Sequence, residues 1–525
     1  MGADRDSAAE ASEGATSAFR ERRSAIRTEM GGAERVERLR AAGGRTIRDH
    51  IEGLLDAGSF EELGTFSHSE RAEDAAATPG DGKVGGHGLL EGRPIAVAGD
   101  DVTVKRGSSS MMGSRKLGKL FDGALRAGHP FVYFGATGGA RIPDSLGSAG
   151  FSKVSPGASM FARRRRFPVA TVIVGDSFGG SSFIAAASDL VVQLRGTCLA
   201  VTSPRVVEIA TGERIEMDAL GGSDVHARRT GQIDLAVDSA DEAYAAVRRF
   251  LSYLPSNAWT TAPRAEARGR LDADPDLPAL VPERRSRGYD VGKVLARIAD
   301  PGSVMELGAG YGRGLTTALA RIDGHAVGLL ASQPKYAAGT LDPPACEKAV
   351  RMICLCDAFD LPLVFCQDCP GFFVGAAVEH DGMLKHAIRL QSALSLARSP
   401  KLTVVLRKAY GMAYYSLGGN DTGVDAVYAW PGAEISFMDP QVAANVVEAE
   451  ALEELGAEER RVRLEELGSA IASDTDPFGA AGRLAVDEII DPAETRRVLA
   501  RALARFEGRQ REPGWQRPLA SWPTR

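Results

Sequence analysis

Short apolar runs alternate along the chain with longer stretches in which apolar residues recur every three or four positions. The runs are rich in valine, isoleucine, leucine and phenylalanine, and they lie at residues 131–134, 169–174, 363–366 and 402–406. A continuous apolar run is typical of a strand buried on both faces of a sheet, and the longer period is typical of helices. The pattern therefore predicts an α/β protein built from βαβ units.

The same order of elements occurs twice. Each copy has a strand, a glycine-rich turn and a helix, followed by a second strand, turn and helix, and equivalent positions lie 232 residues apart. The pairs with this spacing include Gly92 and Gly324, Lys116 and Lys348, Gly139 and Gly371, Pro168 and Pro400, and Gly180 and Met412. An offset maintained over so many elements predicts one fold used twice. We expect the function to lie where the turns of the two copies face each other.

The offset changes once, near the N-terminus. The segment 55–64 (LDAGSFEELG) is related to the segment 299–308 (ADPGSVMELG) by 244 residues, so the first copy carries twelve extra residues. These extra residues fall within about 65–90, where the composition is typical of a loop. In both copies the next segment has two strand-like runs around an acidic residue and a glycine, which predicts a hairpin.

These patterns predict the boundaries of five parts. The second boundary rests on residues 256–284, which contain four prolines and little periodicity. The expected parts are a disordered tail over 1–19, a first domain over 20–260 that begins with a charged helix over 20–43, a linker over 261–285, a second domain over 286–508 and a tail over 509–525. The last tail carries Trp515 and Trp522 and is expected to pack on the body or on a neighbour.

Composition excludes several classes of protein. The chain has 525 residues, 44% of them hydrophobic, and a net charge of −6, which does not favour a general nucleic-acid binder. No apolar run reaches the roughly 18 residues that a membrane-spanning helix needs. The polar N-terminus has no apolar segment of the kind found in secretory signals. We therefore expect a cytoplasmic protein that binds neither a membrane nor a nucleic acid.

The six cysteines have spacings that could suggest zinc. Cys354 and Cys356 are two residues apart, and Cys366 and Cys369 are three apart. The first pair lies in a helical pattern and Cys366 lies in a strand pattern, whereas zinc sites draw their ligands from paired turns. We therefore expect reduced thiols in the core and no metal.

The second turn of the first copy has the composition of an oxyanion-binding site. Gly179 and Gly180 follow an apolar strand and precede a run of small residues that begins with Ser181. Glycines allow a sharp turn and the close approach of a ligand, and the first amides of a helix have no intrahelical partner. Such amides can stabilise an enolate or a tetrahedral oxyanion. The alternative is that the glycines only allow the strand and the helix to pack closely.

Several motifs resemble one family. The segments in question are Thr137–Ile142 (TGGARI), Ser332–Pro334 (SQP), Asp368–Phe372 (DCPGF), Arg407–Gly411 (RKAYG) and Ala429–Ile435 (AWPGAEI). In this order they resemble the carboxyltransferase (β) subunits of biotin-dependent acyl-CoA carboxylases, the propionyl-CoA and acetyl-CoA carboxylase β family of the crotonase superfamily. The resemblance runs from about residue 30 to 510. It implies two tandem crotonase-like (ClpP/crotonase) domains and a homo-oligomer in which the N-domain of one subunit faces the C-domain of another.

The resemblance also implies a mechanism carried by backbone amides. Those of Gly179 and Gly180 would hold the thioester oxygen of an acyl-CoA enolate, and those of Met412 and Ala413 would hold the ureido oxygen of biotin. Carboxybiotin would arrive on a carrier protein that is charged by a biotin carboxylase partner. The residues implied to bind substrate are Gly138, Gly139, Ala140, Arg141, Gly371 and Tyr415. The residues implied on the biotin side are Gly107, Gly411, Met412 and Ala413.

The chain departs from the family pattern at three places. Met412 replaces a glycine of the family turn RKAYGGAY, and Tyr415 occupies a position that is often acidic or aliphatic in relatives. The segment 105–108 reads KRGS where the family reads FGGS. Two alternatives to a carboxyltransferase therefore stay open. One is a biotin-independent acyl-CoA decarboxylase, or related enolate chemistry on the same scaffold, and the other is a non-catalytic subunit of a carboxylase complex.

Four other motifs have ordinary explanations. Ser177 fits the G-x-S-x-G pattern of serine hydrolases, but no motif identifies a partner histidine. The segment 304–312 resembles a nucleotide loop, but strand-like residues follow it where such a loop needs a helix. The run 163–166 of four arginines is typical of a solvated face, although arginine also suits CoA phosphates. His380 and His386 are six residues apart and do not share a helix face.

Overall fold

A computed structural model of the chain describes residues 2–142, 144–154, 157–453, 455–510 and 512–523. The chain forms two compact units. The first comprises Met1–Arg163, Phe167–His226 and Leu235–Leu251, and the second comprises Arg164–Arg166, Ala227–Asp234 and Ser252–Arg525. Residues 252–525, which include the segment 261–285 that we expected as a linker, are grouped with the second unit.

The first unit is built on a seven-stranded sheet with the order β1-β2-β3-β4-β5-β7-β9. The first three strands are antiparallel neighbours, and the pairs from β3 to β9 are parallel. The sheet contains β1 Glu61–Glu62, β2 Lys83–Leu90, β3 Arg93–Asp100, β4 Phe131–Gly135, β5 Val169–Ile173, β7 Leu190–Leu194 and β9 Leu235–Val237. Strands β6 Ser177–Phe178 and β8 Leu199–Ala200 form a separate two-stranded sheet. The α-helices of this unit are α1 Gly2–Glu29, α2 Ala33–Ala41, α3 Ile47–Leu54, α4 Met111–Ala127, α5 Gly147–Phe151, α6 Ala158–Phe161, α7 Gly180–Ala186, α8 Pro204–Thr211, α9 Met217–Gly221, α10 Ser223–Val225 and α11 Ala240–Tyr253.

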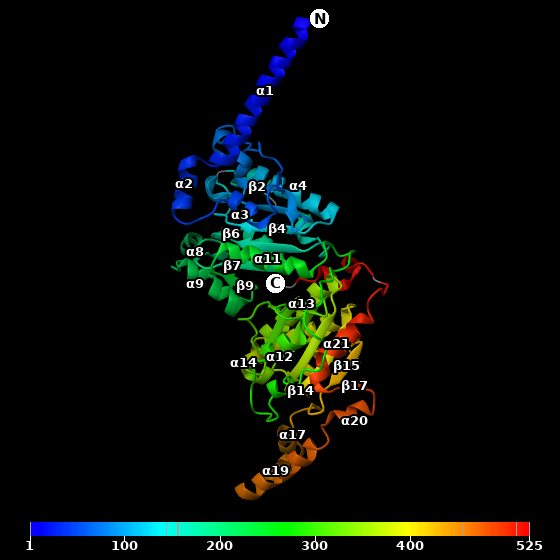
Figure 1. Ribbon diagram of the computed structural model, residues 1–525. Coiled ribbons are helices and arrows are strands. Elements are labelled where there is room, and N and C mark those ends of the chain that lie inside the picture. Colours follow the sequence, from blue (N-terminus) through cyan, green and yellow to red (C-terminus); the bar gives the residue numbers. More distant parts are fainter. Residues whose placement is uncertain (1, 143, 155–156, 454, 511, 524–525) are drawn as a thin grey trace. The chain divides into compact units, whose positions relative to one another are not determined.

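The second unit, whose elements run from green to red in Figure 1, repeats this sheet. Its strand order is β10-β11-β12-β13-β14-β15-β17, and β16 pairs with β14. Its strands are β10 Met305–Glu306, β11 Leu315–Ile322, β12 His325–Ser332, β13 Leu363–Cys369, β14 Lys401–Tyr410, β15 Ala426–Ala429, β16 Glu434–Ser436 and β17 Glu488–Ile489. Its α-helices are α12 Val291–Ile298, α13 Pro343–Ala358, α14 Ala376–His380, α15 Met383–Leu396, α16 Gly411–Ser416, α17 Pro440–Val447, α18 Ala449–Glu453, α19 Ala457–Ala472, α20 Pro477–Ala481 and α21 Thr495–Ala504. The four strands predicted from the apolar runs are therefore confirmed as β4, β5, β13 and β14.

The internal repeat is confirmed in atomic detail. The Asp56 carboxylate accepts bonds from the amides at the tip of the β2–β3 hairpin, at 2.8–2.9 Å. Asp300 does the same for the β11–β12 hairpin at the same distances. Two buried lysines are also equivalent. Lys116 Nζ donates to the carbonyl of Gly64 at 3.1 Å, and Lys348 Nζ donates to the carbonyl of Gly308 at 3.2 Å.

The structure describes both terminal segments, the N-terminal lead-in and the C-terminal tail. The polar lead-in over 2–19, for which we expected disorder, is part of α1, and the helix expected over 20–43 is divided between α1 and α2. The C-terminal tail packs on the second unit. Arg517, in this tail, has 1% of its side chain exposed and forms ion pairs with Asp357 and Asp360.

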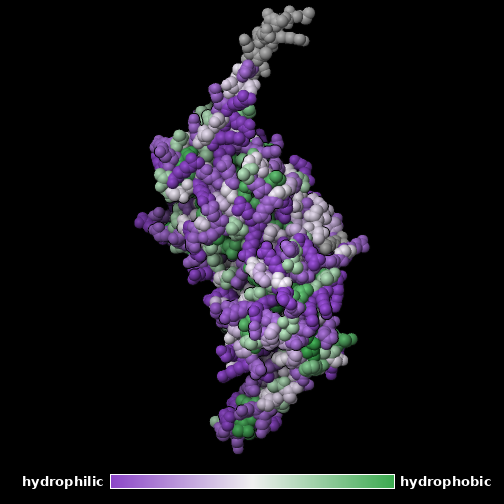
Figure 2. Space-filling model, in the orientation of Figure 1, coloured by the Kyte–Doolittle hydropathy of each residue, from purple (hydrophilic) through white to green (hydrophobic). Residues whose placement is uncertain are grey.

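The surface carries no large apolar belt on the face that Figure 2 shows, where hydrophobic residues form small separate groups among hydrophilic ones. Within the described ranges, no helix combines the length and the apolar character that crossing a bilayer requires. All six cysteines are free thiols in the interior. Burial raises their pKa values, for example that of Cys198 to about 11.

The buried lysines make stability depend on pH. Burial lowers the pKa of Lys116 to about 8 from its ordinary value of 10.5. Between these pH values the unfolded chain binds the proton more tightly, so the lysine destabilises the fold below pH 8 and ceases to do so above 10.5. We compare the free energy of unfolding of the wild type with that of Lys116→Met. The wild-type value minus the variant value should rise by on the order of 1–3 kcal/mol between pH 8 and pH 10.5. Urea unfolding at several pH values measures this difference. A difference that stays flat with pH, as expected for the exposed control Lys293→Met, would contradict it.

Candidate functional site

The turn between β5 and α7 has a backbone conformation that requires glycine. Gly179 has φ 66° and ψ −118°, a combination that residues with a Cβ avoid. The preceding residues Ser177 and Phe178 form β6, which pairs with β8 and fixes the direction in which the chain enters the turn. Gly180 then begins α7, and a Cβ atom on it would lie 3.2 Å from Ser109 Oγ. The sequence therefore places its glycines where the conformation and the available space demand them.

A second turn, after β4, lies beside the first. The carbonyl of Thr137 accepts a bond from the amide of Phe178 at 3.1 Å. A Cβ on Gly179 would lie 4.0 Å from the Cα of Gly139. Ser109 fixes the same turn from the other side, because its amide donates to the carbonyl of Gly139 at 2.8 Å and its carbonyl accepts from the amide of Arg141 at 2.7 Å.

Only one of the two amides that we expected in the oxyanion hole is available. The Gly179 amide donates to the carbonyl of Val201 at 3.1 Å. In the part of the chain that the structure describes, no acceptor is found for the amide of Gly180 or for that of Ala140. Ser109 bonds to Gly139 and Arg141, the two neighbours of Ala140 in the chain. In this bridge the amide of Ala140 itself points away from Ser109. The amide of Gly179 is therefore occupied within the fold, and Gly180 and Ala140 carry the amides without a described acceptor.

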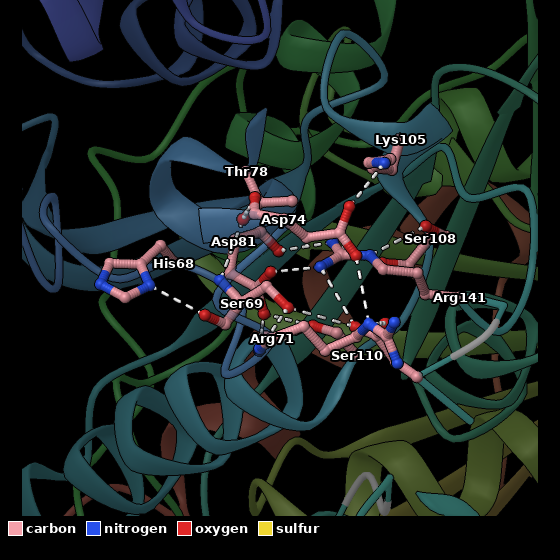
Figure 3. A network of polar contacts seen from close by, with 12 residues as sticks. His68, Ser69, Arg71, Asp74, Thr78, Asp81, Lys105, Ser108, Ser110 and Arg141 are labelled. Atoms are coloured by element: carbon pink, nitrogen blue, oxygen red, sulfur yellow. Dashed lines mark hydrogen bonds and ion pairs between the residues drawn. The ribbon is translucent and has the colours of Figure 1, made fainter. Parts of the chain in front are cut away.

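Arg141 was expected to contact substrate, but its side chain is a buried clamp. Its guanidinium forms an ion pair with Asp81, and the two side chains are 3% and 0% exposed. Asp81 also accepts a bond from Ser110 and, at 2.8 Å, one from the amide of Gly113 in the first turn of α4. Figure 3 shows Arg141, Asp81, Ser108 and Ser110 converging from separate segments. Arg141 therefore positions the turn.

Gly107, expected on the biotin side, also supports this turn from within. Its carbonyl accepts bonds from Thr137 Oγ1 and from the Lys83 Nζ, both at 2.9 Å. Lys83 is in turn paired with the buried Asp100. Lys105, which replaces a phenylalanine of the family motif, donates to Asp74 at 2.9 Å on the surface of the loop that is unique to the first copy (Figure 3). The KRGS segment is therefore part of the scaffold.

The second unit contains the equivalent turn between β14 and α16. Gly411 has φ 60°, close to that of Gly179. Met412 and Ala413 follow it in the first turn of α16, and no acceptor for either amide is found in the described ranges. Met412 has no positive φ, so its backbone does not need the glycine of the family pattern. Its side chain is 59% exposed, whereas Ala413 is buried.

The turn after β13 repeats the geometry of the turn after β4. Leu341 donates its amide to the carbonyl of Gly371 at 3.1 Å and accepts from the amide of Phe373 at 2.8 Å. The amide of Phe372 is thereby left pointing outward, like that of Ala140 in the first unit. Each unit consequently has at least one amide without a described acceptor on each of its two turns. No local pattern in the sequence indicates that the amides of Ala140 and Phe372 point outward, because their direction depends on the pairing of Ser109 and Leu341, which are distant in the sequence.

Polar side chains hold the strand that leads into the second unit's turn. Arg407 Nε donates to Asp368 at 3.0 Å, and both side chains are buried. Tyr410 donates to Glu434, which also pairs with Arg285 at 2.5 Å. Burial, with the hydrogen bond to Glu434, raises the pKa of the Tyr410 hydroxyl far above its ordinary value, so it stays a donor. Tyr415 lies at the surface with 40% exposure and packs edge-on against Tyr414.

The other motifs do not form sites. Ser177 is fully buried and its hydroxyl donates to the carbonyl of Gly175, so it is not a nucleophile at a surface elbow. The segment 304–312 leads into strand β11 and not into a helix. His386 lies 3.3 Å from Glu347. Among the residues that the structure describes, no group of three metal-ligating side chains converges.

The four consecutive arginines correct an expectation, because most of this run is not a solvated face. Arg163 is buried in the first unit and pairs with Asp189 at 2.8 Å. Arg165, in the second unit, is buried and donates to three carbonyls of the C-terminal tail. Arg166 lies over the rings of Trp259 and Trp515. These three guanidinium groups contact a carboxylate, main-chain carbonyls and aromatic rings inside the protein, so they are not arranged as a phosphate site.

Comparisons with known proteins identify the family of the chain. A model of the family described as carboxyl transferase domain matches residues 38–518. The methylmalonyl-CoA carboxyltransferase 12S subunit of Propionibacterium freudenreichii subsp. shermanii is 37% identical over 486 residues, 91% of each chain. The methylmalonyl-CoA decarboxylase subunit alpha of Veillonella parvula is 34% identical, over 90% of this chain and 92% of that one. The biotin-dependent acetyl-/propionyl-coenzyme A carboxylase beta5 subunit of Mycobacterium tuberculosis (strain ATCC 25618 / H37Rv) is also 34% identical, over 91% and 89%.

A solved structure is similar over nearly the whole chain. It is a transcarboxylase 12S structure, a hexamer with methylmalonyl-coenzyme A and methylmalonic acid bound. Its TM-score is 0.88 and its identity 36%, and the match covers 95% of this chain and 96% of that one. The prediction of two tandem crotonase-like α/β domains is therefore confirmed.

The clamp of Arg141 and Asp81 predicts a large loss of stability on substitution. Asp81→Ala leaves the buried guanidinium with only the more distant carboxylate of Asp144, at 3.7 Å, and also removes the acceptor for Ser110 and Gly113. We expect a loss of about 3–5 kcal/mol in the free energy of unfolding. Urea unfolding checks this, with Glu34→Ala as the control because it breaks an exposed pair with Arg38 and should cost less than about 1 kcal/mol. Equal losses in the two variants would show that the buried pair is not a clamp.

Proposed function

Because the chain belongs to the carboxyl transferase domain family, we propose that it transfers a carboxyl group between carboxybiotin and the α-carbon of an acyl-CoA. The observation that supports this most directly is the pair of outward amides on two adjoining turns. In the first unit they belong to Ala140 and Gly180. An oxyanion held by such fixed donors needs no side-chain nucleophile.

The amides of Ala140 and Gly180 would bind the thioester oxygen of the acyl-CoA. Removal of the α-proton moves negative charge onto this oxygen, and the two N–H groups stabilise that charge because they are already oriented toward it. Each such donor contributes about 3–4 kcal/mol to the stability of the charged state. The resulting enolate carbon is the nucleophile that attacks the carboxyl group.

The second unit fits the biotin half of the reaction. The amides of Phe372 and Met412 are its outward pair, and the exposed side chain of Met412 leaves its own amide in an ordinary helical conformation. These amides would hold the ureido oxygen. When bound, carboxybiotin supplies the carboxyl group and, after losing it, a base for the α-proton. Tyr415, exposed three residues after Met412, would border the acyl group.

The carrier of biotin and the enzyme that charges it are proposed to be separate proteins. The relative from Mycobacterium tuberculosis is named as a subunit of a biotin-dependent carboxylase, and the solved relative is a hexamer. We propose that this chain is likewise a homo-oligomer in which first and second units of different copies face each other. Exposed apolar side chains next to the second unit's turns support such a contact. They are Phe373, Val374 and Phe437, which are 43%, 81% and 79% exposed.

An acyl-CoA decarboxylase is the second candidate. One relative of similar identity is named as a methylmalonyl-CoA decarboxylase subunit, and Met412 and Tyr415 depart from the family pattern at the turn assigned to biotin. The amides of the first unit would serve equally, because decarboxylation of a malonyl thioester also passes through an enolate.

Mass spectrometry distinguishes these functions. The purified protein is incubated with acetyl-, propionyl-, malonyl- and methylmalonyl-CoA, with and without a carboxylated biotin carrier. Gain of a carboxyl group only with the carrier supports the carboxyltransferase. Loss of CO2 without it supports the decarboxylase, and no change in either arm contradicts both and favours a non-catalytic subunit.

Gly180→Val tests the proposed oxyanion site. A Cβ there lies 3.2 Å from Ser109 Oγ, and the valine methyl groups would cover the amide. We expect kcat for any acyl-CoA substrate to fall by at least about 100-fold, since one donor contributes that much. Gly479→Val, at a glycine whose Cβ would meet no atom within 4 Å, is the control. Unchanged turnover in a folded Gly180→Val protein would remove Gly180 from the mechanism.

Met412→Gly tests the biotin turn. The methionine side chain is exposed at the surface and belongs to the residue whose own amide is proposed to hold biotin, so we infer that it narrows the approach to that amide. We expect the glycine variant to raise the rate of transfer from carboxybiotin several-fold, with the binding of CoA unchanged. Met412→Leu keeps the bulk and should behave like the wild type. If the glycine variant gains nothing, the side chain does not restrict biotin.

A further inference from the structure

Arg106 is an exposed cation beside the turn that carries Ala140. A Cβ atom on Gly138 would lie 3.4 Å from Arg106 Cβ and 3.8 Å from Arg106 Nε, so the arginine side chain runs along this glycine. Gly138 is two residues before Ala140, and their Cα atoms are therefore at most about 8 Å apart. A small molecule held at the amide of Ala140 consequently has the guanidinium of Arg106 close by.

The backbone of Arg106 is fixed to this turn from both sides. Its own carbonyl accepts a bond from the amide of Gly138 at 3.0 Å. The carbonyl of the next residue, Gly107, accepts one from Thr137 Oγ1 at 2.9 Å. The main chain of the segment is thus part of the scaffold, and it sets the point from which the arginine side chain starts relative to the amide of Ala140.

The conformation at Arg106 does not favour a long side chain. Lys105 and Arg106 have φ values of 46° and 57°, in the left-handed region where glycine is preferred. The second unit repeats this conformation 232 residues later at Ala337 and Ala338, with φ values of 45° and 55°. The turn therefore forms with the smallest side chains as well, and the family pattern FGGS has glycine at the position of Arg106. Because the turn does not need the guanidinium, that group is available to a ligand.

Charge pairing also distinguishes Arg106 from the other cations of the segment. Lys105 pairs with Asp74 at 2.9 Å, and Lys83 pairs with the buried Asp100. Within the ranges that the structure describes, the guanidinium of Arg106 forms neither an ion pair nor a hydrogen bond with the protein. Such a group favours a planar anion that accepts two parallel bonds, and a carboxylate has this geometry.

The surface between the outward amides and Arg106 is formed by two glycines. A Cβ atom on Gly139 would meet no atom within 4 Å, and the three atoms nearest to one on Gly138 all belong to Arg106. Gly139 also has φ 100°, a value that side chains with a Cβ avoid. An acyl group whose thioester oxygen lies at the amides of Ala140 and Gly180 can therefore extend across these glycines, with its far end at Arg106.

We propose that Arg106 determines specificity by binding a carboxylate on the acyl group, so that the preferred ligands are CoA thioesters of dicarboxylic acids. This inference rests on the proposed function, which brings the thioester to Ala140 and Gly180. The carboxylate can come from two sources with the same chemistry. It is either the group on the α-carbon, as in malonyl-CoA, or a group at the end of a longer chain, as in glutaryl-CoA. Because Arg106 is exposed, its contribution should weaken as the salt concentration rises.

Calorimetric titration of the full-length protein without carboxybiotin tests this assignment independently of turnover. Malonyl-CoA is compared with propionyl-CoA, and glutaryl-CoA with pentanoyl-CoA, because in each pair a methyl group replaces the carboxylate. Mass spectrometry after each titration confirms that the thioester is intact. We expect the wild type to bind at least one dicarboxylic thioester more tightly than its neutral counterpart.

The variant Arg106→Gln should lower this ratio of affinities by about 10- to 100-fold, as expected for a hydrogen-bonded charge pair. A ratio that falls for malonyl-CoA assigns the carboxylate on the α-carbon, and one that falls only for glutaryl-CoA assigns the distal carboxylate. A wild type that prefers neither dicarboxylic thioester, or a ratio that Arg106→Gln leaves unchanged, overturns the proposal.

Three further variants distinguish an effect on the ligand from an effect on the fold. Arg106→Lys keeps the charge but loses the two parallel bonds, so it should keep part of the preference. Arg106→Gly suits the left-handed backbone and should lose the preference without a lower midpoint of thermal unfolding. Arg164→Gln is the matched control, because Arg164 is also exposed, has φ 54° and lies outside the first unit. A lower midpoint in Arg106→Gly, with equal losses of affinity for all four thioesters, would show a structural role and reject the proposal.

A kinetic comparison separates this inference from the proposed function. In Arg106→Gln, the KM for the preferred dicarboxylic thioester, divided by the KM for its neutral counterpart, should rise at least about 10-fold. Turnover with an unchanged ratio of KM values would uphold the function and reject the role of Arg106. A binding preference that depends on Arg106, in a protein that neither carboxylates nor decarboxylates any of these thioesters, would uphold the role of Arg106 and reject the function.

Discussion

The buried ion pair between Arg141 and Asp81 connects the segments that surround the outward amides of the first unit. Asp81 accepts bonds from Ser110 and from the start of α4, and Arg141 belongs to the turn that carries Ala140. A charge buried without its partner costs several kcal/mol, so neither side chain can leave while the other stays. The pair consequently fixes the turn, the serine segment and the helix as one body. Amides that stabilise an oxyanion must be oriented before the charge develops, and this clamp provides that orientation.

The two units achieve the same backbone with different side chains. Both have a left-handed glycine before the second helix and an outward amide on each turn. The first unit supports its turns with the Arg141 clamp, and the second supports them with the pair of Arg407 and Asp368. Because the chemistry needs only main-chain N–H groups, side chains around them were free to diverge. This explains how Met412 can stand where relatives have glycine while the amide geometry is retained.

The sequence was sufficient for the fold but only partly for the site. Buried strands and their repeat follow from local patterns, so β4, β5, β13 and β14 could be predicted, as could the equivalence of Lys116 and Lys348. The occupied amide of Gly179 could not, because its acceptor, Val201, directly follows strand β8, and no local pattern indicates that β8 pairs with β6. Arg141 and the arginine run were misjudged for the same reason. From the sequence alone an arginine side chain is expected at the surface. Its burial becomes evident only when the partner that neutralises it, which is distant in the sequence, is known.

The position of the C-terminal tail has a consequence for synthesis on the ribosome. Arg517 is almost the last described residue, yet it neutralises Asp357 in the interior of the second unit. The first unit ends at Leu251 and includes nothing from the second half of the chain. Domains generally fold as they emerge, the N-terminal one first. The first unit can therefore acquire its full set of contacts while translation continues, whereas the second gains its pair between Asp357 and Arg517 only after Arg517 has left the ribosome.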